Sequence, residues 1–511
     1  MSSKILNEKK PRTVALVTLG CARNETDSEE LAGRLAADGW QLVTNPADAE
    51  IAVINTCGFI ESAKKDSIDA LIQAHSLKAN GVTKAVVAVG CMAERYGTEL
   101  AQEMSETDAI LSFDDYKDIS ERLNTIIEGG KIKTHVPKDR RTLLPIAPVD
   151  RAASRDLAKG KEVNPIGTVL RKRLDNAPIA PLKIASGCDR RCSFCAIPYF
   201  RGSFISRKPA EIIEEAKWLA DNGVTELYLV SENTTSFGKD FGDLKMMEKM
   251  LPELSKIDAI KRIRLSYLQP AEVRPTLLQA MISVDKVVPY FDLSFQHANG
   301  DLLRSMRRFG DGEKFLHLIS QIRALSPTAG IRSNFIVGFP GESDDDFAQT
   351  IDLVKEAKFS AAYTFQYSKR PGTPAATMPN QIADDVMADR YNQLHKIQQE
   401  ISKSENEKLI GKTVELLVSG HEGRHDLDQN RMNGRSADFR LTHFDNSAAT
   451  ARPGDLVEVE VVEAFANHIV ASAPISVTKT RGGDAHASWM AEKGDKKILL
   501  GIPTLASLKS L

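Results

Sequence analysis

The sequence predicts an α/β protein with three folded parts. Two long stretches, 13–128 and 182–370, alternate short apolar strands with amphipathic helices, a pattern typical of parallel sheets covered by helices. Further along, short alternating strands separated by turns indicate a small antiparallel barrel. We therefore expect an N-terminal parallel α/β domain over 12–128, a partial TIM-like (β/α)6 barrel with a trailing helix over 181–408, and a small β-barrel over 409–478.

Length and charge exclude several classes of protein. The chain has 511 residues, 27% of them charged, and a formal net charge of −2. A chain of this length normally divides into several domains, and its near-neutral charge gives no global field that would attract nucleic acid. No apolar run approaches the roughly 20 residues of a membrane span, and the first residues lack the apolar core of a secretory signal. We expect a cytoplasmic protein with no membrane partner.

The first domain is expected to contain three buried strands, each of which ends in a cysteine. We place these strands at 13–20, 51–58 and 84–91, with a turn that begins at Cys21 and a helix over 27–38. The three cysteines are Cys21, Cys57 and Cys91. Because the carboxyl ends of parallel strands gather along one edge of a sheet, these thiols can converge although they lie 36 and 34 residues apart.

The other three cysteines are almost contiguous. Cys188, Cys192 and Cys195 lie in the stretch GCDRRCSFC. Three thiolates at this spacing can hold a 4Fe-4S cube and leave its fourth iron open. A structural zinc site is the alternative, but zinc takes four ligands, and the nearest histidines, His135 and His297, are not paired at zinc-ligand spacing. The spacing therefore predicts an iron–sulfur cluster, in a compartment that keeps thiols reduced.

Two interpretations of Cys21, Cys57 and Cys91 are open. A single buried cysteine often behaves as a small hydrophobic side chain, without any reactive role. Three cysteines at the same position of three strands, in a chain whose only other cysteines are the near-contiguous trio, favour a second iron–sulfur cluster.

The near-contiguous trio, with Phe194 before its last cysteine, resembles the signature of radical S-adenosylmethionine (SAM) enzymes. The resemblance implies a cluster whose open iron chelates SAM, and a barrel whose chemistry lies at the carboxyl ends of its strands. The segments LGC, NTCG and VGC ahead of such a core resemble the methylthiotransferase family. That resemblance implies a second 4Fe-4S cluster that supplies or carries the inserted sulfur, with SAM as both radical source and methyl donor. All six cysteines of the family pattern are present.

Contacts with SAM are expected where the barrel strands end. Ser231 and Glu232 follow the strand at 226–233, where the family places polar groups on the SAM ammonium. Gln296 and His297 end the strand at 290–296 and suit the ribose hydroxyls. A helix cap or loop contact is the alternative for each of these side chains.

Two further contacts concern the adenine of SAM. Gly338 opens the stretch GFPGE, whose glycines let the backbone approach a planar ring closely. Phe194 lies between two cysteines and is expected beside the adenine. Three arginines are candidates for binding the SAM carboxylate or an acidic substrate, with a solvated surface role as the alternative: Arg201, Arg207 and Arg308. No acid–base catalytic residue is expected, because the chemistry is radical.

The other parts of the chain are assigned by composition. We expect a linker with an irregular insertion at 129–180, a charged helix at 381–408 and a loosely ordered tail at 479–511. Strands of the small barrel are expected at the segments TVELLVSG, DFRLTHF, DLVEVEVVEAF and HIVASAPI.

The small barrel resembles the TRAM domain, an OB-like module that often binds RNA. Its residues 409–477 carry six basic and ten acidic side chains. An RNA-binding barrel is normally basic, because neutralising phosphates dominates its affinity. The acidic balance favours a basic protein partner instead.

The segment NTCGFIESAKKDS around Cys57 resembles the branch of the family that modifies a ribosomal protein. This branch inserts a methylthio group at the β-carbon of an aspartate in small-subunit ribosomal protein twelve. The alternatives are the branch that modifies N6-isopentenyl-type adenosine in transfer RNA, and a non-catalytic iron–sulfur redox module. We expect a monomer that receives electrons from a reductase such as a flavodoxin or a ferredoxin, with no nucleic acid as its direct substrate.

Overall fold

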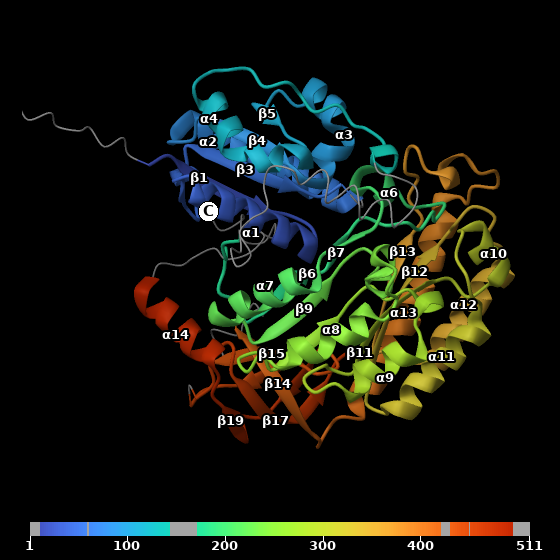
Figure 1. Cartoon of the computed structure of the whole chain (residues 1–511). Helices are drawn as coiled ribbons and strands as arrows, with labels where there is room; N and C mark the ends of the chain where they lie inside the picture. Colours follow the sequence, from blue (N-terminus) through green and yellow to red (C-terminus); the bar gives the residue numbers. More distant parts are fainter. Residues whose placement is uncertain (1–10, 59–60, 144–170, 421–429, 449, 494–511) are drawn as a thin grey trace, which may run out of the picture. The chain divides into compact units, whose positions relative to one another are not determined.

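The chain folds into two compact units, as the computed structural model shows (Figure 1). The structure describes residues 11–58, 61–143, 171–420, 430–448 and 450–493. Of these residues, 11–58, 61–139 and 171–175 belong to the first unit, and 140–143, 176–420, 430–448 and 450–493 belong to the second. Among the described residues, no helix is both long enough and apolar enough to cross a membrane.

The first unit is a parallel sheet between two layers of helices. Its strands follow the order β2-β1-β3-β4-β5, and every neighbouring pair is parallel. The strands are β1 Thr13–Thr18, β2 Gln41–Leu42, β3 Ile51–Thr56, β4 Ala85–Val89 and β5 Ala109–Ile110, and the helices are α1 Ala22–Ala37, α2 Glu61–Asn80, α3 Gly90–Glu103 and α4 Ile119–Ile127. Successive residues of β3 alternate between two apolar cores, which confirms the predicted parallel α/β domain.

The turn predicted to begin at Cys21 is wrong. Helix α1 begins at Ala22, directly after Cys21, although the prediction placed the helix at 27–38. The first turns of α1 bury polar side chains, among them Asn24 and Ser28, so no apolar period marks them in the sequence. Ser28 accepts a hydrogen bond from Thr18 at 2.7 Å, and this pairing replaces an apolar contact with the sheet.

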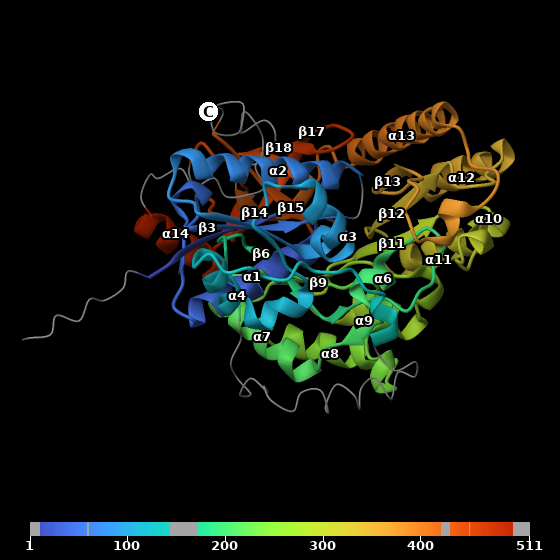
Figure 2. The same ribbon diagram turned by 90° about the horizontal axis from the view of Figure 1, so that it is seen from above.

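The second unit contains six parallel strands in sequence order, with helices on their outer side (Figures 1 and 2). Two three-stranded sheets, β6-β9-β10 and β11-β12-β13, are joined by a parallel bridge between Leu268 and Leu293. The strands are β6 Ile179–Lys183, β9 Glu226–Val230, β10 Arg262–Leu265, β11 Tyr290–Gln296, β12 Gly330–Val337 and β13 Ala361–Gln366. The partial (β/α)6 barrel is confirmed.

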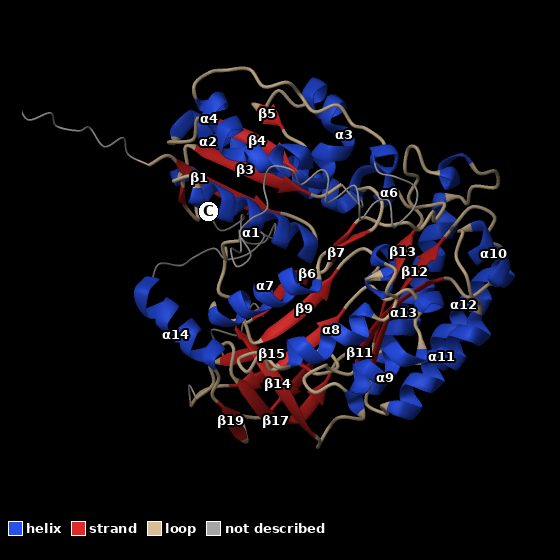
Figure 3. Cartoon of the chain, viewed as in Figure 1, coloured by secondary structure: helices blue, strands red, loops and turns tan. Residues whose placement is uncertain are grey.

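Helices alternate with these strands along the chain (Figure 3). The helices are α6 Ile197–Arg201, α7 Pro209–Asp221, α8 Met246–Ser255, α9 Pro275–Ser283, α10 Gly300–Ser305, α11 Gly312–Leu325, α12 Asp344–Ala357 and α13 Asp384–Glu407. Helix α13 packs against β13 and α12 and also contacts β17 of the small barrel, so it bridges the two parts of this unit. A short antiparallel pair, β7 Ala185–Ser186 and β8 Ile205–Ser206, frames the cysteine loop.

The C-terminal region forms a closed five-stranded barrel with one added edge strand. Strands β14, β15, β16, β18 and β17 pair in a ring that β14 and β17 close, while β19 pairs with the outer side of β17. Their bounds are β14 Thr413–Gly420, β15 Arg431–Ser436, β16 Leu441–Asp445, β17 Leu456–Ala464, β18 Ile469–Ala471 and β19 Ser476–Thr478. Sequence analysis missed β15, whose sequence is RMNGRS, because its residues are mostly polar. Within β15, Gly434 allows the strand to approach the backbone oxygen of Leu417 closely.

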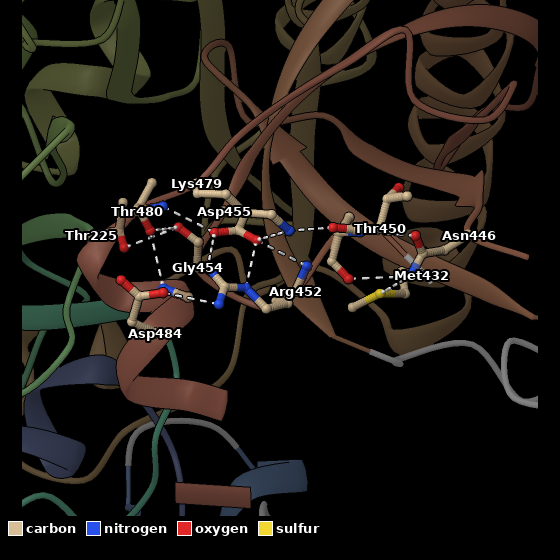
Figure 4. Close-up of polar contacts among 12 residues, drawn as sticks. Thr225, Met432, Asn446, Thr450, Arg452, Gly454, Asp455, Lys479, Thr480 and Asp484 are labelled. Atoms are coloured by element: carbon tan, nitrogen blue, oxygen red, sulfur yellow. Dashed lines mark hydrogen bonds and ion pairs between the residues drawn. The ribbon is translucent and has the colours of Figure 1, made fainter. Parts of the chain in front are cut away.

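The prediction that 479–511 is loosely ordered is wrong for Arg481–Lys493, which form helix α14. Buried Asp455 links the start of this helix to the small barrel, since it accepts hydrogen bonds from Arg452 at 2.9 Å and from the backbone N–H of Thr480 at 3.0 Å (Figure 4). Thr225, before β9, donates to the carbonyl of Gly454 at 3.2 Å. These bonds join the small barrel, α14 and the larger barrel into one unit.

Some predicted features lie outside the described residues. Most of the expected insertion at 129–180 falls in 144–170, and the end of the tail falls in 494–511. Within the insertion, 171–175 belongs to the first unit, because Arg171 and Arg173 pair with Glu29 of α1 at 2.6 and 3.1 Å. The predicted domain boundaries stay predictions.

Candidate functional site

The strand-end cysteines of the first unit occupy three equivalent places. Cys21 follows β1 and precedes α1, Cys57 follows β3, and Cys91 lies in the first turn of α3 directly after β4. Because β1, β3 and β4 are adjacent and parallel, all three cysteines lie at one edge of one sheet. Cys57 and Cys91 are buried and Cys21 is half-buried.

One buried side chain, Asn24, connects the three strand ends. Its backbone N–H donates to the carbonyl of Cys21 at 2.8 Å, and its amide Nδ2 donates to the carbonyl of Thr56, beside Cys57, at 3.2 Å. Its Oδ1 accepts from the Cys91 thiol at 3.6 Å. Asn24 therefore contacts Cys21, Cys91 and the residue before Cys57. Sequence analysis missed Asn24, because its side-chain partners lie on segments that are far apart in the sequence.

Two glycines allow this close approach. Gly20 has a φ of +101°, and a Cβ there would lie 2.9 Å from the Cys57 sulfur. Gly90 has a φ of +89°, and a Cβ there would lie 2.7 Å from the carbonyl oxygen of Thr56. Any larger residue would be strained in backbone and would push the cysteine loops apart.

The donor sets fit an iron–sulfur cluster in chemical type. Thiolate is the usual ligand of such clusters, and both trios consist of thiols alone. Among the described residues, no group of three His, Cys, Asp or Glu side chains is placed to hold a single metal ion. In a cube the three thiolates bind three different irons, so they need not converge on one point.

The second trio lies on the loop between β7 and α6. Gly187, with a φ of +80°, starts this loop where the carbonyl of Ser203 leaves no space for a Cβ. The Cys188 N–H donates to the carbonyl of Gly202 at 3.0 Å, and the Cys195 N–H donates to the carbonyl of Cys192 at 3.1 Å. The loop thus folds back on itself and holds the three thiols in a small volume.

Burial and neighbouring cysteines disfavour the free thiolate forms of Cys188 and Cys195. Burial, with a further contribution from Cys192, raises the pKa of the Cys195 thiol to about 11. Burial also raises the pKa of Cys188 well above its ordinary value, and Cys195 and Cys192 add to the effect. The thiolates of Cys188 and Cys195 would therefore be stabilised by a centre that brings its own positive charge.

Arg308 contacts this trio directly, and its predicted alternative role at the solvated surface is wrong. It is buried, donates to the Cys192 sulfur at 3.8 Å and also donates to the carbonyl of Ser294 in β11. Ser193 fixes the same loop, because its N–H and hydroxyl donate to the carbonyls of Met306 at 3.1 Å and Ser305 at 2.8 Å. The segment before α11 therefore supports the cysteine loop.

A second support of the loop is ionic. Arg190 pairs with Glu272, and Glu272 also accepts hydrogen bonds from Asn233 at 2.7 Å and Ser236 at 2.9 Å. Burial by itself raises the pKa of Glu272, but the Asn233 hydrogen bond and the Arg190 charge outweigh it, so the pKa lies below its ordinary value. Sequence analysis missed this cluster, because its members come from three separate segments.

Ser231 and Glu232 lie buried at the end of β9, as predicted. The Ser231 hydroxyl lies 3.1 Å from the Thr234 hydroxyl and accepts from the Asn233 N–H at 3.1 Å. Glu232 pairs with Arg201 at 3.7 Å, and both side chains are at most 5% exposed, so a solvated role for Arg201 is wrong. Their contacts with SAM stay predictions.

Gln296 has a strained backbone, whereas His297 is fully engaged within the protein. Gln296 has a φ of +78° at an irregularity of β11, a conformation that costs energy for a residue other than glycine. His297 is buried; its Nε2 lies 3.0 Å from Glu342 Oε1, and its Nδ1 accepts from the Asn299 N–H at 3.0 Å. The prediction that His297 binds ribose hydroxyls is therefore wrong, because neither ring nitrogen is left for them.

The remaining candidates have contacts of their own. Gly338, with a φ of +74°, packs against Met387 of α13, and this packing alone requires a glycine. The carbonyl of Phe194 accepts from Arg370 at 3.2 Å. Arg207 pairs with Glu215 of α7 at 2.6 Å and donates to the Lys183 carbonyl at 2.7 Å, so it fastens a helix to the sheet. The predicted adenine contacts of Gly338 and Phe194 stay predictions.

Comparisons with known proteins agree with this geometry. Residues 13–112 match the Uncharacterized protein family UPF0004, and residues 182–354 match the Radical SAM superfamily. A Streptomyces avermitilis protein named ribosomal protein uS12 methylthiotransferase RimO is 54% identical over 424 residues, 80% of this chain and 86% of that protein. A Cutibacterium acnes protein of the same name is 52% identical over 462 residues, 88% of this chain and 95% of that protein.

Solved structures are similar at the level of the fold. The radical SAM methyltransferase TsrM from Kitasatospora setae, with cobalamin and a 4Fe-4S cluster bound, is 14% identical with a TM-score of 0.50. The match covers 72% of this chain and 77% of that chain. A second structure of TsrM, with tryptophan substrate and a SAM analogue bound, has the same TM-score and covers 71% and 75%.

Proposed function

Because the chain belongs to the ribosomal protein uS12 methylthiotransferase (RimO) family, we propose that it inserts a methylthio group into ribosomal protein uS12. The expected position is the β-carbon of an aspartate, and the expected cofactors are two 4Fe-4S clusters and SAM. The observation that carries this proposal is the identity to relatives of that name, 52% over 462 residues and 88% of this chain in one case. No observation favours the transfer RNA branch or a non-catalytic redox module.

Six cysteines would hold the two clusters. Those of the first unit are Cys21, Cys57 and Cys91, and those of the second are Cys188, Cys192 and Cys195. When bound, the clusters and SAM supply hydrogen abstraction from an unactivated carbon, the sulfur atom and the methyl group. An acid–base pair is not suited to removing this hydrogen, because a C–H bond on an unactivated carbon is scarcely acidic at neutral pH.

The chain's own residues position these groups. Asn24 holds the three strand ends of the first unit together, and Arg308 donates a hydrogen bond to a ligand sulfur of the second. Ser231 and Glu232 would bind the SAM ammonium and Gln296 its ribose, while Phe194 and Gly338 would lie beside its adenine. The buried pair of Glu232 with Arg201 offers a fixed carboxylate next to the cysteine loop, since its charge also acts on Cys188.

The remaining partners are part of the same proposal. A reductase such as a flavodoxin or a ferredoxin would reduce the cluster, and the chain would act as a monomer in the cytoplasm, where its ribosomal substrate is made. Residues 409–477 carry four more acidic than basic side chains, which suits a basic ribosomal protein better than RNA.

Anaerobic reconstitution tests this function. We expect about eight iron atoms per chain, as two cubes require, and 5′-deoxyadenosine formation after reduction in the presence of SAM. Mass spectrometry of uS12 should then show a gain of one methylthio group, whereas transfer RNA incubated in parallel should stay unchanged. Modified transfer RNA with unmodified uS12 would refute the proposal, as would iron without any cleavage of SAM.

A further inference from the structure

The inner face of strands β11 and β12 carries a polar cluster that the mechanism above does not use. On β11, Phe291, Leu293 and Phe295 belong to the apolar core shared with the outer helices. Because side chains alternate along a strand, Asp292 and Ser294 lie on the opposite, inner face. Asp292 pairs in register with Arg332 of β12. A fully buried carboxylate and a partly exposed arginine therefore lie side by side on adjacent strands.

Arg332 is held in place but is not enclosed. Its Nη1 donates to Asp292 Oδ2 at 3.0 Å, and its guanidinium lies 4.4 Å from the ring centre of Tyr363 on β13. The Arg332 side chain is 21% exposed, whereas Asp292 is completely buried. An arginine fixed by an ion pair and an aromatic ring keeps further N–H groups for a carboxylate, which it binds with a fork of parallel hydrogen bonds.

Two buried polar atoms of this pair have no hydrogen-bond partner among the residues that the structure describes. They are Arg332 Nε, a donor, and Asp292 Oδ1, an acceptor. A buried polar atom without a protein partner is costly, so each of these two atoms is available to a group that a ligand supplies. Burial also raises the pKa of Asp292, although Arg332 opposes this. A ligand with both an acceptor anion and a donor N–H, such as an aspartyl residue of a peptide, matches this pair.

The cluster is connected to the cysteine loop and is open at one side. Ser294, two residues after Asp292 on the same face, contacts Arg308 through its carbonyl, and Arg308 donates to the Cys192 sulfur. Strand β13 is the outer strand of its sheet, and its Tyr363 and Phe365 are 49% and 39% exposed. A peptide that reaches across these exposed rings would bring a side chain to the place where Tyr363 contacts Arg332.

We propose that Arg332, fixed by Asp292 and Tyr363, binds the carboxylate of the substrate aspartate and selects it over neutral side chains. The inference rests on the proposed function and adds the residue that recognises the modified side chain. Arg332 touches substrate before any chemistry, so its effect is on binding and not on the cleavage of SAM.

Equilibrium binding tests this assignment. Fluorescence anisotropy would compare reconstituted enzyme with labelled uS12 and with labelled uS12 whose target aspartate is replaced by asparagine. We expect the natural enzyme to prefer the aspartate form by about tenfold, the usual scale of a hydrogen-bonded charge. The affinities of Arg332→Gln for the aspartate and asparagine forms should differ by no more than about twofold, because the variant has no guanidinium to pair with the carboxylate. SAM cleavage without substrate and iron content should stay unchanged.

Two variants make the comparison decisive. Arg323→Gln removes an arginine that donates to the carbonyl of Ala357 outside the barrel, and it should keep the full preference for aspartate. Arg332→Lys keeps the positive charge but cannot form two parallel hydrogen bonds, so its preference for the aspartate form should fall to about threefold. This variant replaces Arg332→Gln in the test if Arg332→Gln does not fold. Arg332→Gln or Arg332→Lys with an undiminished preference would overturn the assignment, as would equal binding of both forms by the natural enzyme. A natural enzyme that leaves uS12 unmodified would instead refute the proposed function itself.

Discussion

The two cysteine trios are assembled by different routes. The trio of the second unit is contained in eight residues of one loop, from Cys188 to Cys195, so the local chain path places its thiols. The trio of the first unit comes from three strand ends that are 36 and 34 residues apart, so only the order of the sheet brings it together. The first arrangement depends on loop geometry, and the second depends on the fold of a whole unit.

The supports of the two trios also differ in charge. A neutral amide, Asn24, contacts all three strand ends of the first unit. The loop of the second unit is held by charged groups, through the Arg190–Glu272 pair and through Arg308. We therefore expect the first trio to respond to substitutions that disturb packing, and the second to respond to substitutions and conditions that change charge.

Removal of either trio should have the largest effect and should separate their roles. With Cys57→Ala and Cys91→Ala combined, we expect about half the iron, continued formation of 5′-deoxyadenosine and no methylthio group on uS12. With Cys188→Ala and Cys192→Ala combined, we expect no SAM cleavage at all. Iron analysis and chromatography of the nucleoside products measure both. The comparison fails if the first double variant loses SAM cleavage while it keeps a folded second unit.

Asn24→Ala should have the next largest effect, and it should act on the first trio alone. The substitution leaves buried carbonyls at the ends of β1 and β3 without their donor, which costs about 1–3 kcal/mol of unfolding free energy. We expect iron content after reconstitution to fall toward half, with SAM cleavage retained. Asn45→Ala is the matched control, because Asn45 caps an exposed turn in the same unit. Full iron content in Asn24→Ala would show that the amide does not organise this trio.

The two trios were also unequally predictable from sequence. Cys188, Cys192 and Cys195 could be assigned from spacing alone, because a short loop gives the three thiols no freedom to separate. The convergence of Cys21, Cys57 and Cys91 could be predicted from the parallel-sheet rule, since each cysteine follows an apolar strand. Asn24 could not be predicted, because its partners are carbonyls and a thiol on different strands, and the polar start of α1 hid the helix that carries it.

The barrel strands could be predicted from local sequence patterns, but the pairing of the side chains around them could not. Apolar runs and glycine turns mark the strands from Ile179 to Gln366 in the sequence. In contrast, the pairing of His297 with Glu342, or of Arg332 with Asp292, depends on which residues face each other across strands that are far apart in the chain. A strand-end histidine looks available in the sequence until the structure shows both its ring nitrogens in use.

Arg308→Gln should have a smaller effect, confined to the electronic properties of the second trio. A buried guanidinium that donates to the Cys192 sulfur stabilises the more negative, reduced state of a bound cluster. We expect the variant to bind normal amounts of iron and to have a lower reduction potential, measured by an electron paramagnetic resonance titration of the reduced cluster. Arg207→Gln is the control, because Arg207 pairs with Glu215 on a helix and should leave the potential unchanged. An unchanged potential in Arg308→Gln would show that this hydrogen bond does not tune the centre.

The smallest expected effect concerns pH, and it distinguishes the ionic support from the amide support. Glu272 is partly buried, which raises its pKa, but Asn233 and Arg190 hold the pKa below the ordinary value. The stability that ionised Glu272 contributes is therefore complete above the unfolded-state pKa of about 4.3. This contribution is lost as pH falls through the lower folded-state pKa. We expect iron-free Glu272→Gln to unfold with about 1 kcal/mol less stability at neutral pH, and this deficit to disappear as pH falls below 4.3. Thermal unfolding of both proteins between neutral and acidic pH measures this convergence. In Asn24→Ala the deficit should stay constant over the same range, because an amide does not titrate there; equal pH dependence in the two variants would remove the distinction between the two supports.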